Sequence, residues 1–444
     1  MLELGGDFYD PVAPTDFPET RLRFRNDRWA AAVGLGGLSD GDWIRHFARF
    51  EALPDNLTDK LALRYHGHQF RVYNPDIGDG RGFLFAQLRD GAGRLLDLGT
   101  KGSGQTPYSR FGDGRLTLKG AVRELLATEM LEALGVETSK TFSLIETGEA
   151  LERNDEPSPT RSAVLVRLQH SHIRIGTFQR LATLGHPGNI RKLTAYCLRH
   201  YYADDSGDPV RLLDNVCSQT ARLAASYIAA GFVHGVLNSD NIAITAESFD
   251  YGPWRWTPFW DGHFTAAYFD REGLYSFGRQ PEAIHWDLVQ LAIALRPIAD
   301  AEPLTAMLET FPGRFQAALR DALFARLGLV PGELARDLEL VAAIEDALAK
   351  QNVTIDRFFF VRRGGRVGDD LPELAPLVAA REAVAGARDH PYWSDPEPCS
   401  LHIKEVEAIW SAIDQADDWA PLHAKIDSIR RMGAAHATQM LEKS

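Results

Sequence analysis

The feature that most constrains this 444-residue chain is the order of its elements, because strand-like segments come before residue 172 and helical segments follow it. Between residues 75 and 170, two short apolar runs surround the turn Asp90–Gly93, and one helical segment separates them from two further strands. After residue 172, apolar residues recur mainly at helical spacing. The pattern predicts an α+β fold with a small strand-rich unit and a larger, mainly helical unit.

Hydrophobic periodicity and turn residues place the individual elements. In the strand-rich unit we expect a hairpin over 82–101, a helix over 116–136, and strands over 140–148 and 161–169. Helices are expected over 28–33, 40–50, 191–202, 209–230, 282–295, 303–327 and 331–350. The predicted division of the chain is an irregular N-terminal arm (1–60), the strand-rich unit (61–172), the helical unit (173–370) and a helical C-terminal extension (371–444).

Composition and charge narrow the class of protein. A formal net charge of −13 disfavours a general nucleic-acid or anionic-membrane binder, which needs a basic surface. No apolar run in the sequence approaches the roughly 20 residues of a membrane helix. The three cysteines, Cys197, Cys217 and Cys399, form no C-x-x-C pair and indicate neither a zinc site nor a disulfide framework. Because the N-terminus is acidic and unlike a targeting segment, we expect a cytoplasmic protein.

The segment from Phe232 to Gly252 is similar to the catalytic segment of kinase-like phosphotransferases, with one residue replaced. His234-Gly235 opens the motif, Asn241 stands at the expected offset, and an Asp-aromatic-Gly metal motif follows at Asp250. Val236 occupies the position of the catalytic aspartate, and valine neither accepts a proton nor binds a metal. The segment therefore indicates either an inactive kinase or a different chemistry on a kinase frame, with a nucleotide in the cleft between the two units.

Three oxygen-bearing side chains in this segment are candidate functional groups. Asn241 and Asp250 suit Mg²⁺, which usually takes one or two protein ligands plus phosphate oxygens and waters. Asp240 directly precedes Asn241. Single Asn and Asp residues in loops are usually turn formers, but three of them between V-H-G and D-Y-G are a more specific signal.

A lysine and a glutamate upstream fit the same interpretation. Lys101 ends the second hairpin strand, and Glu124 lies in the helix that follows. A strand lysine paired with a helix glutamate is how kinases hold ATP phosphates. Taken alone, the two residues are more simply a solvated lysine and a surface glutamate. The segment that contains Asn241 and Asp250 reverses that preference.

Two glycine-rich segments flank the hairpin. Residues 76–82 (DIGDGRG) form a turn that would bring backbone N–H groups and Arg81 to a phosphate, although the segment is neither a P-loop nor a dinucleotide fingerprint. Residues 101–115 contain four glycines, which let a backbone approach a ligand. A plain turn and a flexible connector are the simpler alternatives.

Buried arginines and paired histidines complete the candidates. Arg167 lies inside an apolar strand and needs a partner, because burying a lone charge is costly. A phosphate would serve Arg167 and the nearby Arg174, but an unidentified acid is an equally weighted alternative. The two H-x-H pairs, His66–His68 and His170–His172, are expected to be structural because the sequence offers no third and fourth metal ligand.

Together these residues resemble one known family, the selenoprotein O (YdiU) protein adenylyltransferases, which have a pseudokinase fold. The resemblance implies a bilobal protein-kinase-like fold with 61–172 as the N-lobe and 173–370 as the C-lobe. It also implies transfer of AMP from ATP to Ser, Thr or Tyr hydroxyls of proteins, its own included. The matching segments over residues 60–296 are YHGHQF, IGDGRG, DLGTKGSGQTPYSRFGDGR, VRELLATEMLEALGV, VLVRLQHSHIRIGTFQ, HGVLNSDNIAI, FDYGPW and GLYSFGRQPEAIHWDLVQLA.

The resemblance also implies roles for individual residues. In the family, ATP lies in a flipped orientation, so that the α-phosphate faces the acceptor. Asn241 and Asp250 match the ligands of Mg²⁺ or Mn²⁺, and Asp240 matches the proposed proton acceptor. The positions that match ATP-binding residues are Gly78, Gly80, Arg81, Lys101 with Glu124, Asp113, Gly114, Arg167, Arg174 and Asp250.

The chain departs from the family pattern in several places. The usual Tyr-Ala-Gly-His-Gln-Phe-Gly has His66 and Arg71 at its second and last positions, which leaves details of nucleotide or acceptor binding open. Some members carry a regulatory disulfide between a cysteine after D-Y-G and one near the C-terminus. Ala266 takes the first position here, and the C-terminal sequence MLEKS contains no cysteine, so we expect no such redox switch.

Three other functions remain open at this stage. The chain could transfer UMP from UTP, or the γ-phosphate with another acid in place of Val236, or it could be a nucleotide-binding scaffold. The scaffold needs no metal ligands, so it is disfavoured by the intact set of Lys101, Glu124, Asp240, Asn241 and Asp250.

Overall fold

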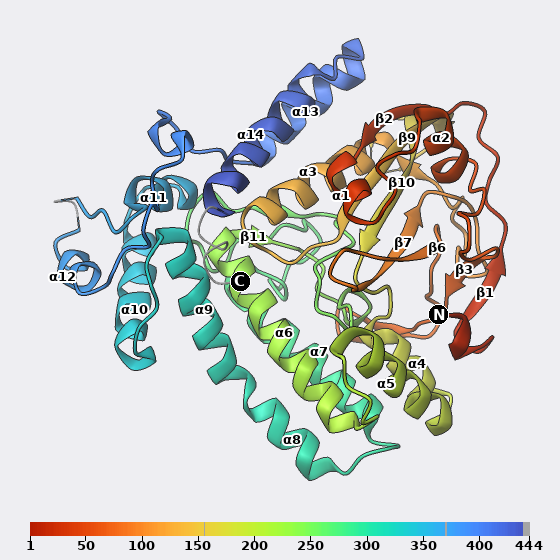
Figure 1. Ribbon diagram of the computed structural model, residues 1–444, viewed down its shortest axis with the longest axis horizontal. Helices are drawn as coiled ribbons and strands as arrows, with labels where there is room; N and C mark the ends of the chain where they lie inside the picture. Colours follow the sequence, from red (N-terminus) through yellow and green to blue (C-terminus); the bar gives the residue numbers. More distant parts are fainter. Residues whose placement is uncertain (155, 369–370, 438–444) are drawn as a thin grey trace.

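The computed structural model describes residues 1–154, 156–368 and 371–437. Most strands lie together at one side of the molecule and most helices at the other (Figure 1), as the α+β prediction requires. The strands are β1 (Tyr9–Val12), β2 (Arg21–Arg25), β3 (Lys60–Leu63), β4 (Gly67–Gln69), β5 (Val72–Asn74), β6 (Leu84–Arg89), β7 (Leu95–Lys101), β8 (Leu116–Thr117), β9 (Lys140–Leu151), β10 (Thr160–Gln169), β11 (Phe232–Val233) and β12 (Arg255–Trp256).

Helices make up the rest of the regular structure. Four short 3₁₀ helices are η1 (Leu2–Leu4), η2 (Ser239–Asn241), η3 (Phe277–Arg279) and η4 (Pro391–Ser394). The α-helices are α1 (Asp27–Ala32), α2 (Asp40–Phe47), α3 (Leu118–Ala133), α4 (Ile175–Thr183), α5 (Pro187–Tyr202), α6 (Pro209–Ala230), α7 (Gln280–Leu295), α8 (Ala301–Glu309), α9 (Phe311–Leu327), α10 (Leu334–Lys350), α11 (Ile355–Arg362), α12 (Leu374–Ala379), α13 (Ile403–Ala416) and α14 (Ala420–Ala437).

Eight of the described strands form one antiparallel sheet in the order β1-β3-β6-β7-β10-β9-β2, with β8 paired to β10. The predicted hairpin is β6–β7, and Asp90 closes its turn by accepting hydrogen bonds from the backbone of Ala92 and Arg94 (3.0 and 2.9 Å). Both edge strands, β1 and β2, come from residues 1–60, which we expected to be irregular. That expectation was wrong because these strands are short, and Pro11 within β1 is compatible with an edge position only.

The two faces of the sheet carry different helices. Along β10, Val164 and Val166 belong to the apolar cluster that includes α2, whereas Leu165 belongs to the cluster that includes α3. This alternation is the period of two expected for a strand buried on both faces. Trp43 of α2 stacks on Phe142 of β9 with ring centroids 4.9 Å apart. Helix α3, which carries Glu124, is therefore fixed against one face of the sheet.

The helical part differs from prediction at three places, and one of them is α11, a helix that was not predicted. We expected one helix over 303–327, but α8 ends at Glu309 and α9 begins at Phe311. Pro312 lies in the first turn of α9, and because proline lacks an N–H it interrupts a helix that approaches it. Helix α4 was not predicted at all. None of the described helices combines the length and apolar character needed to cross a membrane.

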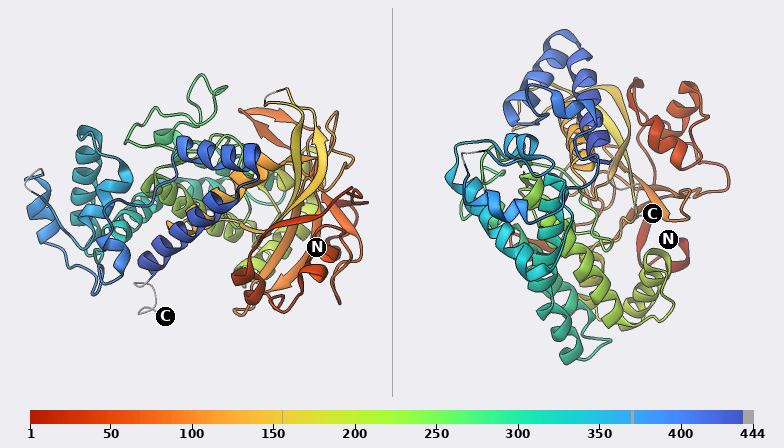
Figure 2. Two further views of the ribbon diagram at one scale, coloured as in Figure 1. Left: turned by 90° about the horizontal axis from the view of Figure 1, so that it is seen from above. Right: turned by 60° about the vertical axis from the view of Figure 1, so that its left-hand side comes forward.

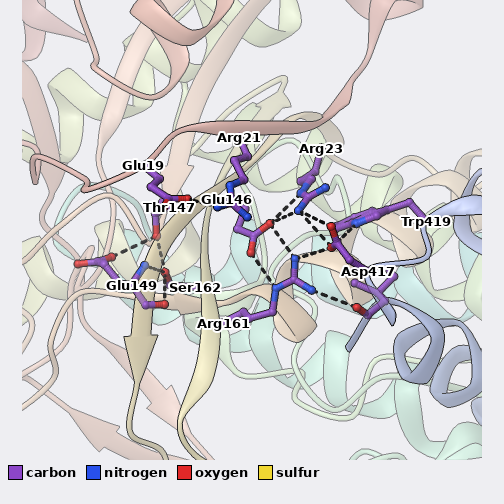
Figure 3. A network of polar contacts seen from close by, with 11 residues as sticks. Glu19, Arg21, Arg23, Glu146, Thr147, Glu149, Arg161, Ser162, Asp417 and Trp419 are labelled. Carbon is purple, nitrogen blue, oxygen red and sulfur yellow. Dashed lines mark hydrogen bonds and ion pairs between the residues drawn. The ribbon is translucent and has the colours of Figure 1, made fainter. Parts of the chain in front are cut away.

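A network of charged side chains joins the turn after α13 to the sheet (Figure 3). Glu146 on β9 is buried and pairs with Arg23 of β2 at 2.6 Å and Arg161 of β10 at 2.7 Å. Asp417 pairs with the same two arginines at 3.1 and 2.7 Å. Arg23 also stacks over the ring of Trp419 at 4.6 Å. Each arginine thus bridges a buried carboxylate on the sheet and an exposed one after α13.

Replacing Asp417 by asparagine is expected to lower the free energy of unfolding by about 0.5–1 kcal/mol, because an ion pair to a half-exposed carboxylate contributes little. Asparagine tolerates the left-handed backbone of this position (φ 49°), so the variant removes only the charge. The midpoint of urea unfolding measures the change. Glu146→Gln, at the buried end of the network, should cost more. Equal costs for both variants would contradict this account.

Candidate functional site

A cleft of about 810 Å³ opens where the sheet meets the first helical segments, within the size range of small-molecule sites. Glu124 and Asn241 are buried next to this cleft and do not belong to its described lining. The predicted residues that do line it are Gly78, Gly80, Arg81, Lys101, Asp113, Gly114, Arg167, Arg174, Asp240 and Asp250.

Lys101, the last residue of β7, lies between two carboxylates. Its Nζ is 2.6 Å from Oε2 of Glu124 on α3 and 2.7 Å from Oδ1 of Asp250. The side chain of Glu124 is 1% exposed, whereas that of Asp250 is 32% exposed. Helix α3 therefore holds the ammonium group from the buried side, and Asp250 contacts it from the side of the cleft.

Arg167 and Arg174 add two buried guanidinium groups. Arg167 lies 3.9 Å from carboxylate oxygens of Glu124 and Asp250, and Arg174 lies 3.4 Å from Asp79. One terminal nitrogen of Arg167 and the Nε of Arg174 are buried without a hydrogen-bond partner. Buried donors are almost always paired, so a bound anion is the natural partner for these two. The sequence left open whether a phosphate or an acid is the partner of Arg167. The structure shows acids near both arginines, but these acids leave the two nitrogen atoms without a hydrogen bond.

The structure adds functional residues that the sequence analysis missed. The guanidinium group of Arg174 lies over the rings of Tyr65 (4.2 Å) and Phe249 (4.8 Å), and that of Arg167 lies 5.3 Å from Phe249. These rings fix the cations in place. Tyr65 and Phe249 could have been found from their positions in the sequence. Tyr65 opens the Y-H-G-H segment, and Phe249 directly precedes D-Y-G.

Asp250 remains ionised among these groups. Burial alone would raise the pKa of its carboxyl, but four nearby cations outweigh burial and hold the pKa well below its usual range: Lys101, Arg167, Arg174 and Arg81. The residue adopts a left-handed backbone (φ 62°), which Asp and Asn tolerate better than other side chains. An anionic oxygen thus faces the cleft at the centre of the cations.

Gly78 and Gly80 shape the wall of the cleft. A Cβ at Gly78 would lie 2.5 Å from the ring of Tyr108, and one at Gly80 would lie 2.9 Å from the Tyr108 carbonyl oxygen. Ser109 Oγ donates a hydrogen bond to the Gly80 carbonyl at 2.5 Å. The two glycine-rich segments therefore pack directly on each other. Contact of their backbone with a phosphate stays a prediction.

Asp113 and Gly114 lie at the rim of the cleft. Gly114 has φ 71°, and a Cβ there would lie 2.3 Å from backbone atoms of Gly104. Asp113 pairs with Arg153 at 2.9 Å. Against the effect of partial burial, Arg153 and the backbone N–H of Arg115 hold the pKa of Asp113 below its usual value.

Asp240 is a buried carboxylate at the floor of the cleft. Burial raises its pKa to about 6, although Arg174 opposes the shift. Its Oδ1 is buried without a hydrogen-bond partner. Gly67 of β4 packs against it so closely that a Cβ would lie 2.9 Å from Asp240 Cβ, a constraint the sequence analysis missed. Asp240 is nevertheless one of the residues that line the cleft, and a buried polar oxygen without a partner is unusual in a folded protein.

Val236 contributes through its backbone. The side-chain amide of Asn241 donates a hydrogen bond to the Val236 carbonyl oxygen at 2.9 Å. His234 is buried and bonds the Phe249 carbonyl at 2.9 Å, which ties this segment to the one that ends at Asp250. The H-G-V turn thus orients Asn241 and Asp250 without a carboxylate of its own.

The histidines of the first H-x-H pair have partners within the protein. His66 bonds the hydroxyl of Tyr73 (2.7 Å), and His68 bonds the amide of Gln179 (2.7 Å). Arg71, the second departure from the family motif, pairs with Glu282 at 3.2 Å. His66 and Arg71 lie outside the described lining of the cleft.

The regulatory disulfide of some family members involves positions that are buried here, as far as the described residues include them. Ala266 is 8% exposed, and Cys197, Cys217 and Cys399 are buried thiols. The C-terminal sequence MLEKS lies outside the described residues.

The donor set fits a divalent cation bound together with phosphates. The described residues contain no cluster of three or more His, Cys, Asp and Glu side chains that would hold a metal alone. Asp250 offers a partly exposed carboxylate, and Asn241, whose amide nitrogen is bonded to the Val236 carbonyl oxygen, offers its amide oxygen beside the cleft. Mg²⁺ typically takes one or two protein oxygens and completes its shell with phosphate and water, so this set is sufficient.

Comparisons with known proteins agree with this geometry. The family model for protein adenylyltransferase SelO matches residues 1–364. Protein nucleotidyltransferase YdiU of Gloeobacter violaceus is 45% identical over 96% of this chain and 93% of its own length. The YdiU proteins of Synechococcus elongatus and Synechocystis sp. are 40% and 39% identical over 97% and 96% of this chain and 94% and 96% of their own lengths. The chain belongs to the SelO family.

Proposed function

We propose that this protein is a nucleotidyltransferase that transfers AMP from ATP to Ser, Thr or Tyr hydroxyls of proteins, with Mg²⁺ or Mn²⁺ as cofactor. Membership of the SelO family supports the enzyme class and ATP as the nucleotide. One observation carries the chemistry. A single cleft holds the cations Lys101, Arg167 and Arg174 beside Asp250 and the buried carboxylate of Asp240, whose Oδ1 has no hydrogen-bond partner.

The architecture proposed for this function is bilobal and protein-kinase-like. Residues 61–172 would form the N-lobe, 173–370 the C-lobe, 1–60 an N-terminal arm and 371–444 a C-terminal extension. The antiparallel sheet with α3 on one face and the helical part beyond residue 173 support this division. The arm contributes the two edge strands of the sheet, so it belongs structurally with the N-lobe.

The cations bind and neutralise the triphosphate. Lys101, held by Glu124, meets phosphate oxygens as a point charge, whereas Arg167 and Arg174 offer their unpaired N–H groups. Arg81, which also lines the cleft, adds a further positive charge. Such fixed cations stabilise the negative charge that develops on pyrophosphate as it leaves.

A divalent cation would be held by Asp250 and Asn241. When bound, it would supply further neutralisation of phosphate charge. Asp250 would hold the cation with an oxygen that now contacts Lys101, and Glu124 would still hold the lysine.

Asp240 is the proposed proton acceptor. The acceptor hydroxyl oxygen bonds to the α-phosphorus as the bond from that phosphorus to the bridging oxygen breaks and pyrophosphate departs. The hydroxyl proton passes to the carboxylate of Asp240. The raised pKa of this group, caused by burial, makes it a better base than an exposed aspartate.

Transfer from ATP labelled at the α-phosphate is expected to mark protein in a lysate or the enzyme itself, and ATP labelled at the γ-phosphate is not. Both reactions are run with Mg²⁺ and with Mn²⁺, and label is read from protein after removal of free nucleotide. Transfer of the γ-label would overturn the proposal in favour of a kinase. UTP as the preferred donor would make the protein a UMP transferase, and binding without transfer a scaffold.

A further inference from the structure

We propose that the helix pair α13–α14 is a built-in clamp on α3, and that Glu129 and Arg430 are positioning residues for the Lys101–Glu124 pair. This inference rests on the proposed role of that pair in holding ATP phosphates. The clamp lies beyond residue 364, where the match to the family model ends. Figure 2 shows α13 and α14 lying along α3.

The strongest tie is a buried ion pair between α3 and α14. The guanidinium group of Arg430 donates two hydrogen bonds to Glu129, both of 2.8 Å. The Glu129 side chain is 3% exposed, and that of Arg430 is 38% exposed. A two-point arginine–carboxylate contact fixes orientation as well as distance, so it restrains how α3 can rotate. Arg430 also lies 5.8 Å from the ring of Phe24 on β2.

Glu129 and Glu124 project from different sides of α3. Five residues apart on an α-helix correspond to about 140° of rotation. Glu124 points to Lys101 on the sheet, and Glu129 points to Arg430 on α14. Helix α3 is thus held between the strand that carries the lysine and the C-terminal helix. A shift of α3 away from α14 would move Glu124 relative to Lys101.

Two further contacts restrain α3 at its ends. In its first turn, Lys119 pairs with Glu407 of α13 at 2.7 Å. At its last residue, Ala133 meets Gly433 of α14, where a Cβ on the glycine would lie 3.1 Å from the alanine Cβ. The close approach shows that the two helices touch nearly backbone to backbone there. The clamp therefore contacts α3 along its whole length.

The clamp is itself anchored to the sheet. Asp417, between α13 and α14, pairs with Arg23 and Arg161, which also hold the buried Glu146 (Figure 3). The apolar faces of both helices join the same core cluster as α3: Val406, Ile409, Trp410, Ile413, Leu422, Ile426, Ile429 and Met432. Sheet, α3 and clamp consequently form one packed unit, in which the position of α3 is set from outside the cleft.

ATP affinity of the full chain, measured by calorimetry well below the unfolding temperature, tests the clamp. Arg430→Ala is expected to weaken ATP binding about 2- to 30-fold, the usual size of an effect transmitted through packed elements. Arg430→Lys should restore part of the loss. Arg431→Ala is the matched control, because Arg431 is the next residue of α14 and pairs with Asp395 rather than with α3. It should leave the affinity unchanged.

The double variant Arg430→Ala/Glu124→Gln separates positioning from a general loss of stability. If Arg430 acts through Glu124, the double variant binds ATP no more weakly than Glu124→Gln alone. Losses that multiply, or an Arg430→Ala affinity equal to that of Arg431→Ala, would overturn the clamp. If Arg430→Ala does not fold, Lys119→Gln replaces it in every comparison. Lys119 lies in the more exposed first turn of α3, and the expected outcomes are the same.

The same measurements distinguish the clamp from the proposed function. If Glu124→Gln leaves ATP affinity unchanged, the proposed role of the Lys101–Glu124 pair fails, and the clamp inference fails with it. If Glu124→Gln weakens binding and Arg430→Ala does not, only the clamp is wrong.

Discussion

Replacing Asp250 by asparagine is expected to reduce metal-dependent transfer by about 10²–10³-fold or more, since several kcal/mol of charge stabilisation would be lost with the cation. Asparagine is preferable to alanine because the position has φ 62°, which asparagine tolerates. The variant removes the partly exposed anion that Lys101, Arg167, Arg174 and Arg81 surround. Initial rates with α-labelled ATP across a range of Mn²⁺ and Mg²⁺ concentrations measure the effect.

The control for this variant is Asp261→Asn, which makes the same change in the following loop. Asp261 accepts a hydrogen bond from the backbone of His263 and lies outside the described cleft lining. It should retain full activity. Undiminished transfer by Asp250→Asn at low metal concentration would remove Asp250 from the metal site. High metal concentration restoring the rate would instead support its role as a ligand.

The local parts of the site could be predicted because their signals are local. Turn residues around Asp90, the strand that ends at Lys101 and the helix that carries Glu124 all lie in segments with strong periodicity. The order of these segments, followed by D-N and D-Y-G, was enough to expect that Lys101, Asp240 and Asp250 would meet. The structure brings all three to one cleft.

The features that were missed depend on contacts between distant segments. Strands β1 and β2 are stabilised by pairing with β3 and β9. The sequence of β1 (YDPV) contains a proline and no strand pattern, whereas that of β2 (RLRFR) alternates polar and apolar residues, a strand signal that was missed. Gly67 is required because Asp240 approaches it from far along the chain. Likewise, the sequence around Arg430 gives no sign that this arginine has a buried partner. The partner, Glu129, is brought to it by the packing of α14 on α3.

Val236 shows how a missing residue can be informative once geometry is known. From sequence, the valine left open whether the protein was an inactive kinase. In the structure its carbonyl oxygen accepts a hydrogen bond from Asn241, so the turn keeps its role in orienting a proposed metal ligand. Four residues after the valine, Asp240 supplies a buried carboxylate to the lining of the cleft, and one of its oxygens has no hydrogen-bond partner. This arrangement favours an active site with a relocated base.

Replacing Asp240 by asparagine tests that relocation. Turnover is expected to fall about 10²–10⁴-fold, because the amide cannot accept the hydroxyl proton. ATP affinity should change little, since Asp240 contributes no positive charge to phosphate binding. Asparagine has nearly the shape of aspartate, which the close contact with Gly67 requires. Single-turnover rates with α-labelled ATP, together with ATP affinity from calorimetry, separate the two effects.

The matched control for this change is Asp287→Asn on α7. Asp287 is also a buried aspartate with unpaired oxygens, and burial raises the pKa of its carboxyl well above the usual value, a shift towards the neutral form that asparagine resembles. It lies outside the described cleft lining and should keep its turnover. Full turnover of Asp240→Asn would exclude Asp240 as the base. Equal losses in both variants would mean that a buried carboxyl near the cleft supports the fold rather than the proton transfer. A selective loss in Asp240→Asn, with ATP affinity retained, assigns the proton to the carboxylate beside Asn241 and explains how the chain does without one at Val236.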